Sequence, residues 1–552
     1  MPLDALITGR IATLAGDAGF GWVEAIGIRD GRVAFAGSAV DLETRADAHT
    51  ERLTLEPGEV AIPGLTDAHL HLAQAALATH HLDLTASPSL ADGLRRIRVA
   101  HGEAVVAGDP EAWLQGHGWD SDRWGGWPTA ADLEAAAPGR RVALWAHDHH
   151  ALWTSHSALR TAGVTTDTRD PAGGIIRRTP AGGPEGVLHD AAARLVTVHI
   201  PLASNADLEC SLVGLGHELL ELGIVAVHDP GGLAPDADLA FSFPAYAALS
   251  EAGRLPVRVH ACLRDDALGT ALAGGLRSGD VLGSDPDGRA RIGWQKCFAD
   301  GSMGSRTARL LDDIEAEGDR PLPPEQRRGL WMTEPDVLAD LVARAAAGGI
   351  ATQIHAIGDA AVRVALDVLA PVAGRLPLMP RIELVQMLHP ADRPRFAGAR
   401  IAASVQPVHL GTDAPGARRL WGERAEERSY TWGSLARGGA ILAFGTDAPV
   451  EPVDPWPGIA LAVTRVDPRW GSGTTPFAPA EALTLDRALR AACVDAAISA
   501  GELDRGRLVA GHRADVVVLP AAAIHEPVEP GGALATARPN VVLMDGRVVF
   551  ER

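Results

Sequence analysis

The chain reads Val60-Ala61-Ile62-Pro63-Gly64-Leu65-Thr66-Asp67-Ala68-His69-Leu70-His71, an apolar run that ends in two histidines. Residues two apart in a β-strand point to the same side, so His69 and His71 are expected to face the same way. Two imidazoles on one side of a strand can bind one cation together. A lone His-x-His pair is common, and it gains weight here because it ends a strand of the buried type. The run predicts a strand with a metal-binding pair at its carboxyl end.

Seven further apolar runs predict strands of the same kind, separated by helical stretches. Near-continuous apolar runs are typical of strands covered on both faces, and their alternation with helices indicates parallel strands with crossovers. Eight such units favour an α/β fold of the closed (β/α)8 type, the TIM barrel, with its active site at the carboxyl ends of the strands. The predicted strands are Val60–His71, Ile224–Asp229, Pro256–Leu263, Ile292–Asp300, Ala351–Gly358, Arg381–Gln386, Arg400–Pro407 and Ile441–Val450.

Both ends of the chain carry short strands separated by glycine turns. Each end alone is too small to bury a core, so we expect one small composite β-sandwich from the two. The predicted division is residues 1–62 and 496–552 for the sandwich and 63–495 for the barrel. The expected strands are Leu6–Leu14, Val23–Arg29, Arg32–Gly37 and Glu59–Ile62 at the start, and Ala514–Leu519 and Val541–Phe550 at the end.

About residues 75–220 separate the first two barrel strands, which is far too long for one crossover. This stretch is rich in tryptophan and histidine. We therefore predict an insertion after the first barrel strand that forms a lid or lines the pocket, with most of the tryptophans packed in its own core.

Composition narrows the function classes. The chain has 552 residues, 46% of them hydrophobic and 22% charged, as in soluble globular proteins. No apolar run is long enough to span a bilayer, and Met1-Pro2-Leu3-Asp4 does not resemble a signal peptide, so we expect a cytoplasmic protein with no membrane partner. A net charge of −20 argues against a nucleic-acid partner. The four cysteines lie far apart, which predicts neither disulfides nor a zinc–cysteine cluster.

Lys296 is the single lysine among 50 basic Lys and Arg residues. It lies inside the apolar fourth strand, where burial lowers the pKa of an amine. A neutral amine can add CO2 and become a carbamate that acts as a carboxylate and can bridge two metal ions, whereas arginine in practice stays protonated. A structural ion pair with a nearby aspartate is the alternative.

Two more strands end in polar residues of the ligand type. The fifth ends in His355 and the eighth in Asp447. Imidazoles and carboxylates suit Zn²⁺, and also Mn²⁺, Fe²⁺ or Ni²⁺, with zinc the expected ion. Such an ion lowers the pKa of its water to about 7 and polarises a carbonyl. Asp447 would orient that water, accept its proton and pass it to the leaving amine.

These motifs resemble those of the amidohydrolase superfamily, and most closely its YtcJ-like (amidohydrolase-3) branch. The matches follow the family's order over nearly the whole chain. They are Pro63-Gly64-Leu65-Thr66-Asp67-Ala68-His69-Leu70-His71, Gly116-His117-Gly118-Trp119-Asp120, Lys296-Cys297-Phe298-Ala299-Asp300-Gly301-Ser302, Ser305-Arg306-Thr307-Ala308, His355-Ala356-Ile357-Gly358-Asp359, Ser404-Val405-Gln406-Pro407, Gly445-Thr446-Asp447-Ala448-Pro449 and Ala514-Asp515-Val516-Val517-Val518-Leu519.

The resemblance implies a TIM barrel with a composite β-sandwich, and hydrolysis of amides, N-acyl amines and similar C–N bonds other than peptide bonds. It also implies a site with one or two metals. His69 and His71 would bind the first metal, Lys296 would bridge as a carbamate, His355 would bind the second metal, and Asp447 would be the acid/base.

One departure bears on the second metal. The family usually has Arg-Ile-Glu-His at the end of the sixth strand, with the histidine as a ligand, and this chain has Arg381-Ile382-Glu383-Leu384. Either the site works with one metal, or Gln386, His389 or His228 substitutes, or the second ion binds weakly. We expect a firm first site.

Five residues are candidates for substrate contact. His150 matches the family's histidine in Asp148-His149-His150, where relatives commonly have Asp-Gly-His. Arg306 could bind a carboxylate bidentately or form a structural salt bridge. The others are Gln406 and His409, which follow the seventh strand, and His228, which could instead orient another histidine.

Three functions are compatible with these residues. The leading hypothesis is an amide or N-acyl hydrolase acting on a small molecule through metal-activated hydroxide. A deaminase, or a lactone or ester hydrolase, would use the same site. A metal-binding protein with little turnover is the third, and the retained Asp447 and Lys296 argue against it. A homodimer is the expected assembly, although no motif predicts it.

Overall fold

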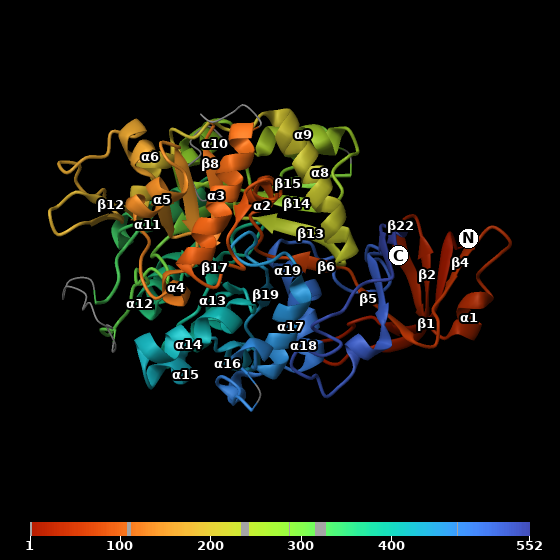
Figure 1. Cartoon of the computed structure of the whole chain (residues 1–552). Helices are drawn as coiled ribbons and strands as arrows, with labels where there is room; N and C mark the ends of the chain where they lie inside the picture. Colours follow the sequence, from red (N-terminus) through yellow and green to blue (C-terminus); the bar gives the residue numbers. More distant parts are fainter. Residues whose placement is uncertain (1–2, 107–111, 233–241, 286, 315–326, 472) are drawn as a thin grey trace.

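The structure is a computed structural model that describes residues 3–106, 112–232, 242–285, 287–314, 327–471 and 473–552. Three parts lie in a row in Figure 1. A parallel barrel occupies the centre, a sheet built from both chain ends lies on one side, and an inserted sheet lies on the other. The predicted fold class, a (β/α)8 barrel with a composite terminal domain and an insertion, is confirmed.

The barrel is an eight-stranded parallel sheet that is nearly closed. Its order is β19-β18-β17-β16-β15-β14-β13-β6, so neighbours in sequence are neighbours in space. The two edge strands meet where the Ala68 amide donates to the Phe444 carbonyl at 2.8 Å. The strands are β6 (Leu65–Asp67), β13 (Ile224–Asp229), β14 (Arg258–Arg264), β15 (Ala290–Phe298), β16 (Thr352–Ala356), β17 (Arg381–Leu384), β18 (Ala402–Val405) and β19 (Leu442–Phe444).

The first predicted strand, Val60–His71, is wrong as a single element, because the chain changes sheets at Gly64. β5 (Glu59–Pro63) pairs with strand β20 of the terminal sheet, and β6 pairs with β13 of the barrel. A Cβ at Gly64 would lie 2.7 Å from a methyl carbon of Val225, so glycine permits this close passage. Both sheets bury the run, which explains why it is mostly apolar.

The terminal sheet has the order β22-β21-β20-β5-β1-β2-β3, with β4 pairing with β1. Side chains from both chain ends form one core, in which Ile7, Ile26 and Val33 pack with Val516, Val518 and Leu543. The additional elements are β1 (Ala5–Ala12), β2 (Trp22–Arg29), β3 (Arg32–Gly37), α1 (Ala39–Glu43), β4 (Glu51–Thr54), β20 (Val516–Pro520), β21 (Val541–Met544) and β22 (Arg547–Glu551).

The insertion forms a six-stranded sheet of order β11-β12-β10-β9-β8-β7. Trp119 packs within 6.3 Å, between ring centroids, of Trp124, Trp127 and Trp153, so these tryptophans form the insertion's core. Its elements are β7 (Leu82–Asp83), α3 (Leu90–Val106), β8 (Leu114–Trp119), α4 (Ser121–Trp124), α5 (Ala130–Ala136), β9 (Val142–Ala146), β10 (Ala151–Thr154), α6 (His156–Thr161), β11 (Gly174–Arg178), β12 (Pro184–Asp190) and α7 (Arg194–Thr197).

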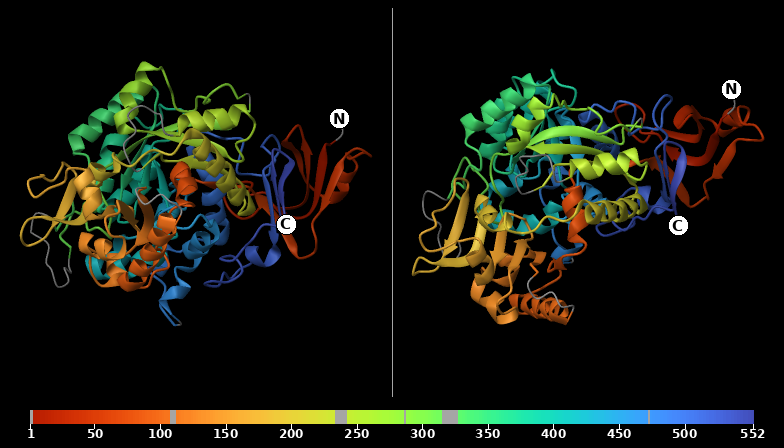
Figure 2. Two further views of the ribbon diagram at one scale, coloured as in Figure 1. Left: turned by 45° about the horizontal axis from the view of Figure 1, so that its top comes forward. Right: turned by 90° about the horizontal axis from the view of Figure 1, so that it is seen from above.

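The inserted sheet is shorter than the predicted stretch of about residues 75–220. α8 (Asn205–Glu221) shares the barrel core with α2 (Leu72–Ala78) through Leu212, Leu215 and Leu72. It therefore belongs to the outer layer of the barrel, and Figure 2 shows it beside the barrel strands.

The other helices of this outer layer surround the barrel (Figures 1 and 2). They include α9 (Phe243–Glu251), α10 (Leu268–Ala273), α11 (Pro335–Ala347), α12 (Asp359–Leu369), α13 (Arg393–Ala399), α14 (His409–Trp421), α15 (Arg424–Arg428), α16 (Trp432–Arg437), α17 (Pro455–Thr464), α18 (Leu485–Arg490) and α19 (Ala496–Ser499). Among the described residues, none of the helices combines the length and apolar character that crossing a membrane requires.

Candidate active site

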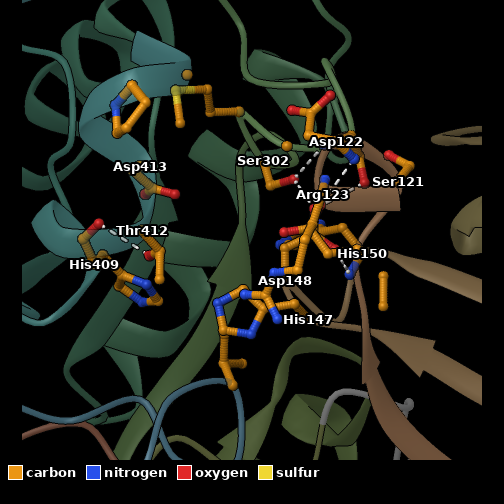
Figure 3. A pocket seen from close by; sticks show the side chains of 18 of the residues that line it. Ser121, Asp122, Arg123, His147, Asp148, His150, Ser302, His409, Thr412 and Asp413 are labelled. Carbon is orange, nitrogen blue, oxygen red and sulfur yellow. Dashed lines mark hydrogen bonds between the residues drawn. The ribbon is translucent and has the colours of Figure 1, made fainter. Parts of the chain in front are cut away.

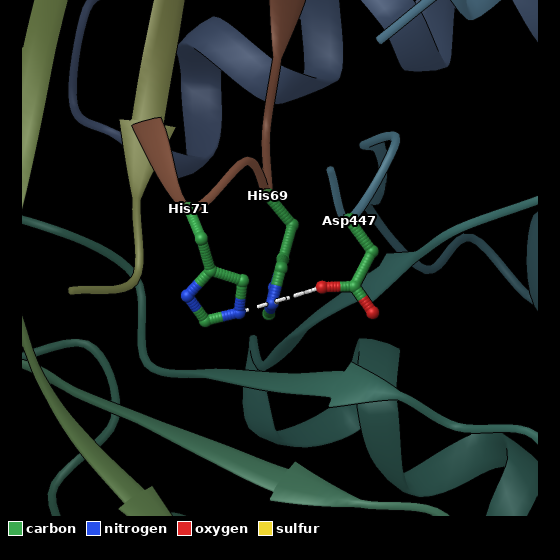
Figure 4. A group of neighbouring side chains, drawn as sticks. All are labelled: His69, His71 and Asp447. Atoms are coloured by element: carbon green, nitrogen blue, oxygen red, sulfur yellow. Dashed lines mark ion pairs between the residues drawn. The ribbon is translucent and has the colours of Figure 1, made fainter. Parts of the chain in front are cut away.

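His69, His71 and Asp447 meet at the carboxyl end of the barrel. The two histidines follow β6, Asp447 follows β19, and all three side chains point toward one another in Figure 4. The Nε2 atoms of His69 and His71 lie 3.3 and 3.5 Å from Asp447 Oδ1. All three side chains are buried. One ligand atom from each lies within 4.8 Å of the others, which is close enough for them to share one ion.

A hydrogen bond behind each imidazole fixes its orientation. His69 Nδ1 lies 2.5 Å from Glu383 Oε2, and His71 Nδ1 lies 2.6 Å from the carbonyl oxygen of Gly231. A carbonyl oxygen only accepts, so Nδ1 of His71 carries a proton, and Nε2 is the ring nitrogen that faces Asp447. Histidines that bind metals are commonly oriented in this way.

The convergence of these atoms fits a divalent cation. Asp447 Oδ1 is buried and has no hydrogen-bond partner among the described residues, although two Nε2 atoms face it. Burial alone would raise the pKa of Asp447, but His69 and a hydrogen bond from His409 hold it well below its usual value. An anionic oxygen and two imidazole nitrogens are a donor set for zinc and similar ions.

Lys296 and His355 lie on the neighbouring strands β15 and β16. Lys296 Nζ lies 4.8 Å from the ring centroid of Phe298, and in the described part of the chain it forms no hydrogen bond or ion pair. Burial outweighs Glu383 and Asp447 and lowers the pKa of Lys296 to about 8. His355 Nε2 lies 3.2 Å from the carbonyl oxygen of Gly301, so that nitrogen already has a partner.

Leu384 places an apolar side chain at the end of β17, where it is buried against the cavity. Each of the three alternative ligands makes one hydrogen bond through its side chain, although Gln386 Oε1 and His228 Nε2 have no partner among the described residues. Gln386 Nε2 donates to Asp413 at 3.0 Å, and His389 Nδ1 accepts from the amide of Ala391. His228 lies in the barrel interior, where its Nδ1 accepts from Arg381 at 2.9 Å.

A cavity of about 390 Å³ lies above the triad, between the barrel and the insertion. Figure 3 shows it with His409, Thr412 and Asp413 on one side and Asp148, His150 and Arg123 on the other. Its apolar lining comes from Trp119, Trp127, Met303, Leu384 and Val450. Asp447 lines the same cavity, which therefore joins the triad to a space for a small molecule.

Two predicted substrate contacts, His150 and His409, line this cavity. His150 Nδ1 lies 2.6 Å from Asp190 Oδ1. Burial opposes the charged imidazole, but Asp190 outweighs it and raises the pKa of His150. His409 Nε2 lies 3.0 Å from Asp447 Oδ2, so His409 contacts the triad itself.

The other three predicted contacts lie away from the cavity lining. Arg306 donates to Asp122 at 3.1 Å and so forms a structural salt bridge, the alternative to substrate contact. Gln406 is buried, and neither of its amide atoms has a partner among the described residues. His228 is the barrel-interior residue described above.

Several polar residues of the site were not singled out from the sequence. Glu383 stands behind His69, and Glu451 Oε1 joins His147 at 3.1 Å to Thr412 at 2.9 Å. Asp148 Oδ2 accepts from Ser302 and Ser305 at 2.6 and 2.9 Å. Glu383 could have been identified from the sequence, because it is a carboxylate inside a strand that is predicted to be buried. The partners of the others come from distant segments, and no spacing links them.

Comparison with known proteins identifies the family. The model described as "Amidohydrolase family" matches residues 57–550. Protein LONG AFTER FAR-RED 3 of Arabidopsis thaliana is 32% identical over 528 residues, which cover 94% of this chain and 87% of that protein. The putative amidohydrolase YtcJ of Bacillus subtilis is 28% identical over 500 residues, covering 90% of each. N-substituted formamide deformylase of Arthrobacter pascens is 25% identical, covering 99% of this chain and 98% of that protein.

A solved structure supports the same fold. An uncharacterized metal-dependent hydrolase from Pyrococcus horikoshii superposes with a TM-score of 0.72 at 24% identity, covering 94% of this chain and 97% of that one. At this identity the likeness concerns the fold alone. The family model, which spans most of the chain, confirms the resemblance found in the sequence, and the chain belongs to the amidohydrolase family.

Proposed function

We propose that this protein is a metal-dependent hydrolase that cleaves an amide or N-acyl C–N bond of a small molecule. The observation that carries the proposal is the convergence of His69 Nε2, His71 Nε2 and Asp447 Oδ1 below a cavity of about 390 Å³. Membership in the amidohydrolase family supports the hydrolase class. The likeness to a formamide deformylase over nearly the full chain supports a C–N bond as the target.

His69, His71 and Asp447 would hold the ion, with zinc the expected metal. When bound, such an ion polarises the scissile carbonyl and acidifies a water molecule. The residues behind the triad keep the imidazoles in place, since Glu383 and the Gly231 carbonyl hold each Nδ1 and leave each Nε2 free to bind.

Asp447 is the proposed general acid/base. Its carboxylate takes the proton of the attacking water and returns it to the nitrogen of the leaving amine, so that the products are an amine and a carboxylate. His409 contacts the second oxygen of Asp447 at 3.0 Å and holds the carboxylate in one orientation during both transfers.

Lys296 and His355 are the proposed ligands of a second, weaker position. A buried lysine whose pKa is lowered to about 8 is partly neutral near neutral pH, and the neutral amine can add CO2 to form a carbamate. Leu384 contributes no donor atom on this side. The second position is therefore expected to bind its ion less tightly than the first.

Product analysis tests the proposal. Purified protein is stripped with a chelator, reloaded with Zn²⁺, and incubated with N-acyl amines, N-acyl amino acids, aminopurines, lactones and esters. We expect equimolar amine and carboxylate from at least one N-acyl compound, lost on stripping and restored by Zn²⁺. Ammonia released from an aminopurine, or turnover of lactones or esters alone, would contradict the C–N acyl assignment. The absence of any metal-dependent turnover would contradict the hydrolase itself.

A further inference from the structure

Asp413 has a fixed carboxylate on the cavity wall and is not one of the triad residues. It lies on α14 beside Thr412, and Figure 3 shows its side chain at the same side of the cavity as His409. The Tyr430 hydroxyl donates to Asp413 Oδ2 at 2.8 Å, and Gln386 Nε2 donates to the same oxygen at 3.0 Å. Two buried donors thus hold this carboxylate in one orientation.

Both donors bind the same oxygen, which leaves Oδ1 for another partner. In the described part of the chain, Oδ1 of Asp413 accepts no hydrogen bond, and neither arginine nor lysine forms an ion pair with the carboxylate. Burial raises the pKa of Asp413, while the neighbouring His409 and the hydrogen bond from Tyr430 oppose that rise. A charged group with one oxygen free in a cavity is matched best by a cation.

The arginines that line the same cavity are already engaged. Arg419 pairs with Asp122 at 2.7 Å, and Arg469 pairs with Asp467 at 2.6 Å. Arg123 donates to the Thr85 carbonyl at 2.5 Å. Each of these arginines is therefore paired with a group other than Asp413.

Asp413 lies close to the point where the proposed reaction occurs. His409, one helical turn before it on α14, contacts Asp447 Oδ2 at 3.0 Å. Residues four apart on a helix have Cβ atoms roughly 5–6 Å apart. A short substituent on the substrate can therefore reach Asp413 while the scissile bond lies at the triad.

We propose that Asp413 binds a cationic nitrogen of the substrate, an ammonium or amidinium group carried on a short chain next to the scissile bond. This inference rests on the proposed function and adds a substrate class to it: N-acyl derivatives of diamines and similar basic amines. The apolar lining from Met303, Leu384 and Val450 would cover the aliphatic part of such a molecule.

Matched pairs of amides test this proposal. The probes are ω-aminoalkyl acetamides with two to four methylenes and alkyl acetamides in which a methyl group replaces the ammonium. We expect the Zn²⁺-loaded wild-type protein to favour one cationic member over its neutral partner by about tenfold to a hundredfold in kcat/KM. Equal kcat/KM for every pair would overturn the inference and leave the proposed function standing, whereas failure to hydrolyse any acyl compound would count against the function itself.

Two variants test whether Asp413 causes the preference for cationic over neutral amides. Asp413→Asn keeps the size of the side chain and removes its charge, so the ratio of cationic to neutral kcat/KM should fall by at least about tenfold. Tyr430→Phe keeps the charge and releases one oxygen, so the ratio should fall by about threefold. Asp336→Asn, on α11 and exposed, is the matched control and should leave the ratio unchanged. A wild-type ratio retained in both Asp413→Asn and Tyr430→Phe would overturn the proposal.

Discussion

The two halves of the barrel mouth differ in how they are prepared for a metal. On the side of β6 and β19, His69, His71 and Asp447 converge, and a hydrogen bond behind each imidazole leaves Nε2 facing the carboxylate. On the side of β15 to β17, His355 Nε2 is bound to a carbonyl oxygen and Leu384 is apolar. Each half draws polar residues from neighbouring strand ends, yet among the residues that the structure describes one half alone forms a compact donor set.

This difference indicates that a histidine at a strand end is prepared to bind a metal when a hydrogen bond to its Nδ1 fixes the orientation of the ring. Glu383 is the link between the halves, because it lies on β17 beside Leu384 but serves His69 across the barrel. Its Oε1 lies 2.7 Å from Arg381 Nε, so a buried ion pair holds the carboxylate in place. Strand β17, on the side without a compact donor set, thus supplies the carboxylate that orients His69.

The largest effect is expected for Asp447→Asn, on the converging side. An amide cannot accept the proton of the attacking water, so kcat should fall by about 10³-fold or more. Steady-state kinetics on the best acyl substrate measures this, with the exposed Asp340→Asn as control. Wild-type kcat in Asp447→Asn would contradict the assigned acid/base.

Lys296→Arg is expected to have the next largest effect. Arginine keeps the positive charge but does not form a carbamate, so kcat should fall by about a hundredfold if a carbamate forms part of the site. Nuclear magnetic resonance with carbon-13 bicarbonate should show a carbamate in the wild type and none in the variant. A fully active Lys296→Arg protein would exclude a role for the carbamate.

Glu383→Gln tests the support behind His69. Glutamine still accepts a hydrogen bond from Nδ1 but lacks the charge, so zinc affinity should fall by about 10- to 100-fold. Competition with a zinc-binding dye measures the affinity. If the affinity does not change, the carboxylate behind His69 does not tune the metal site.

Leu384→His should have the smallest effect on the rate and a clear effect on stoichiometry. A histidine at this position would add a donor beside Lys296 and His355, so the number of bound ions should rise toward two, with kcat changed by about threefold or less. Metal content of dialysed protein provides the measurement. An unchanged stoichiometry would show that Leu384 is not what weakens the second position.

The barrel was largely predictable because each buried parallel strand is a continuous apolar run. Ile224–Asp229 was predicted with the bounds that β13 has. Ile441–Val450 was too long, since β19 ends at Phe444 and the chain then turns through Asp447 at φ 63°. Apolar character continues past the strand because the turn is buried too, so composition alone does not locate the end.

The triad residues could be named from the sequence, but the pairing of each histidine with its partner could not. His69 and His71 stand at a strand end, whereas Glu383 and Gly231, which orient them, lie 314 and 160 residues away in the sequence. Asp413 lies on a helix among other polar residues, and only the folded structure shows that Tyr430 and Gln386 donate hydrogen bonds to it. Such contacts depend on how loops pack, and local patterns do not contain that information.

Metals per chain test the central claim most directly. Inductively coupled plasma mass spectrometry would be applied to dialysed wild-type protein and to the His69→Ala/His71→Ala double variant, after both are loaded with Zn²⁺. Tightly bound zinc close to one ion per wild-type chain, lost in the double variant, is the predicted result. Zinc retained at the same level without both imidazoles, or no zinc in the wild type, would contradict a metal centre built on His69, His71 and Asp447.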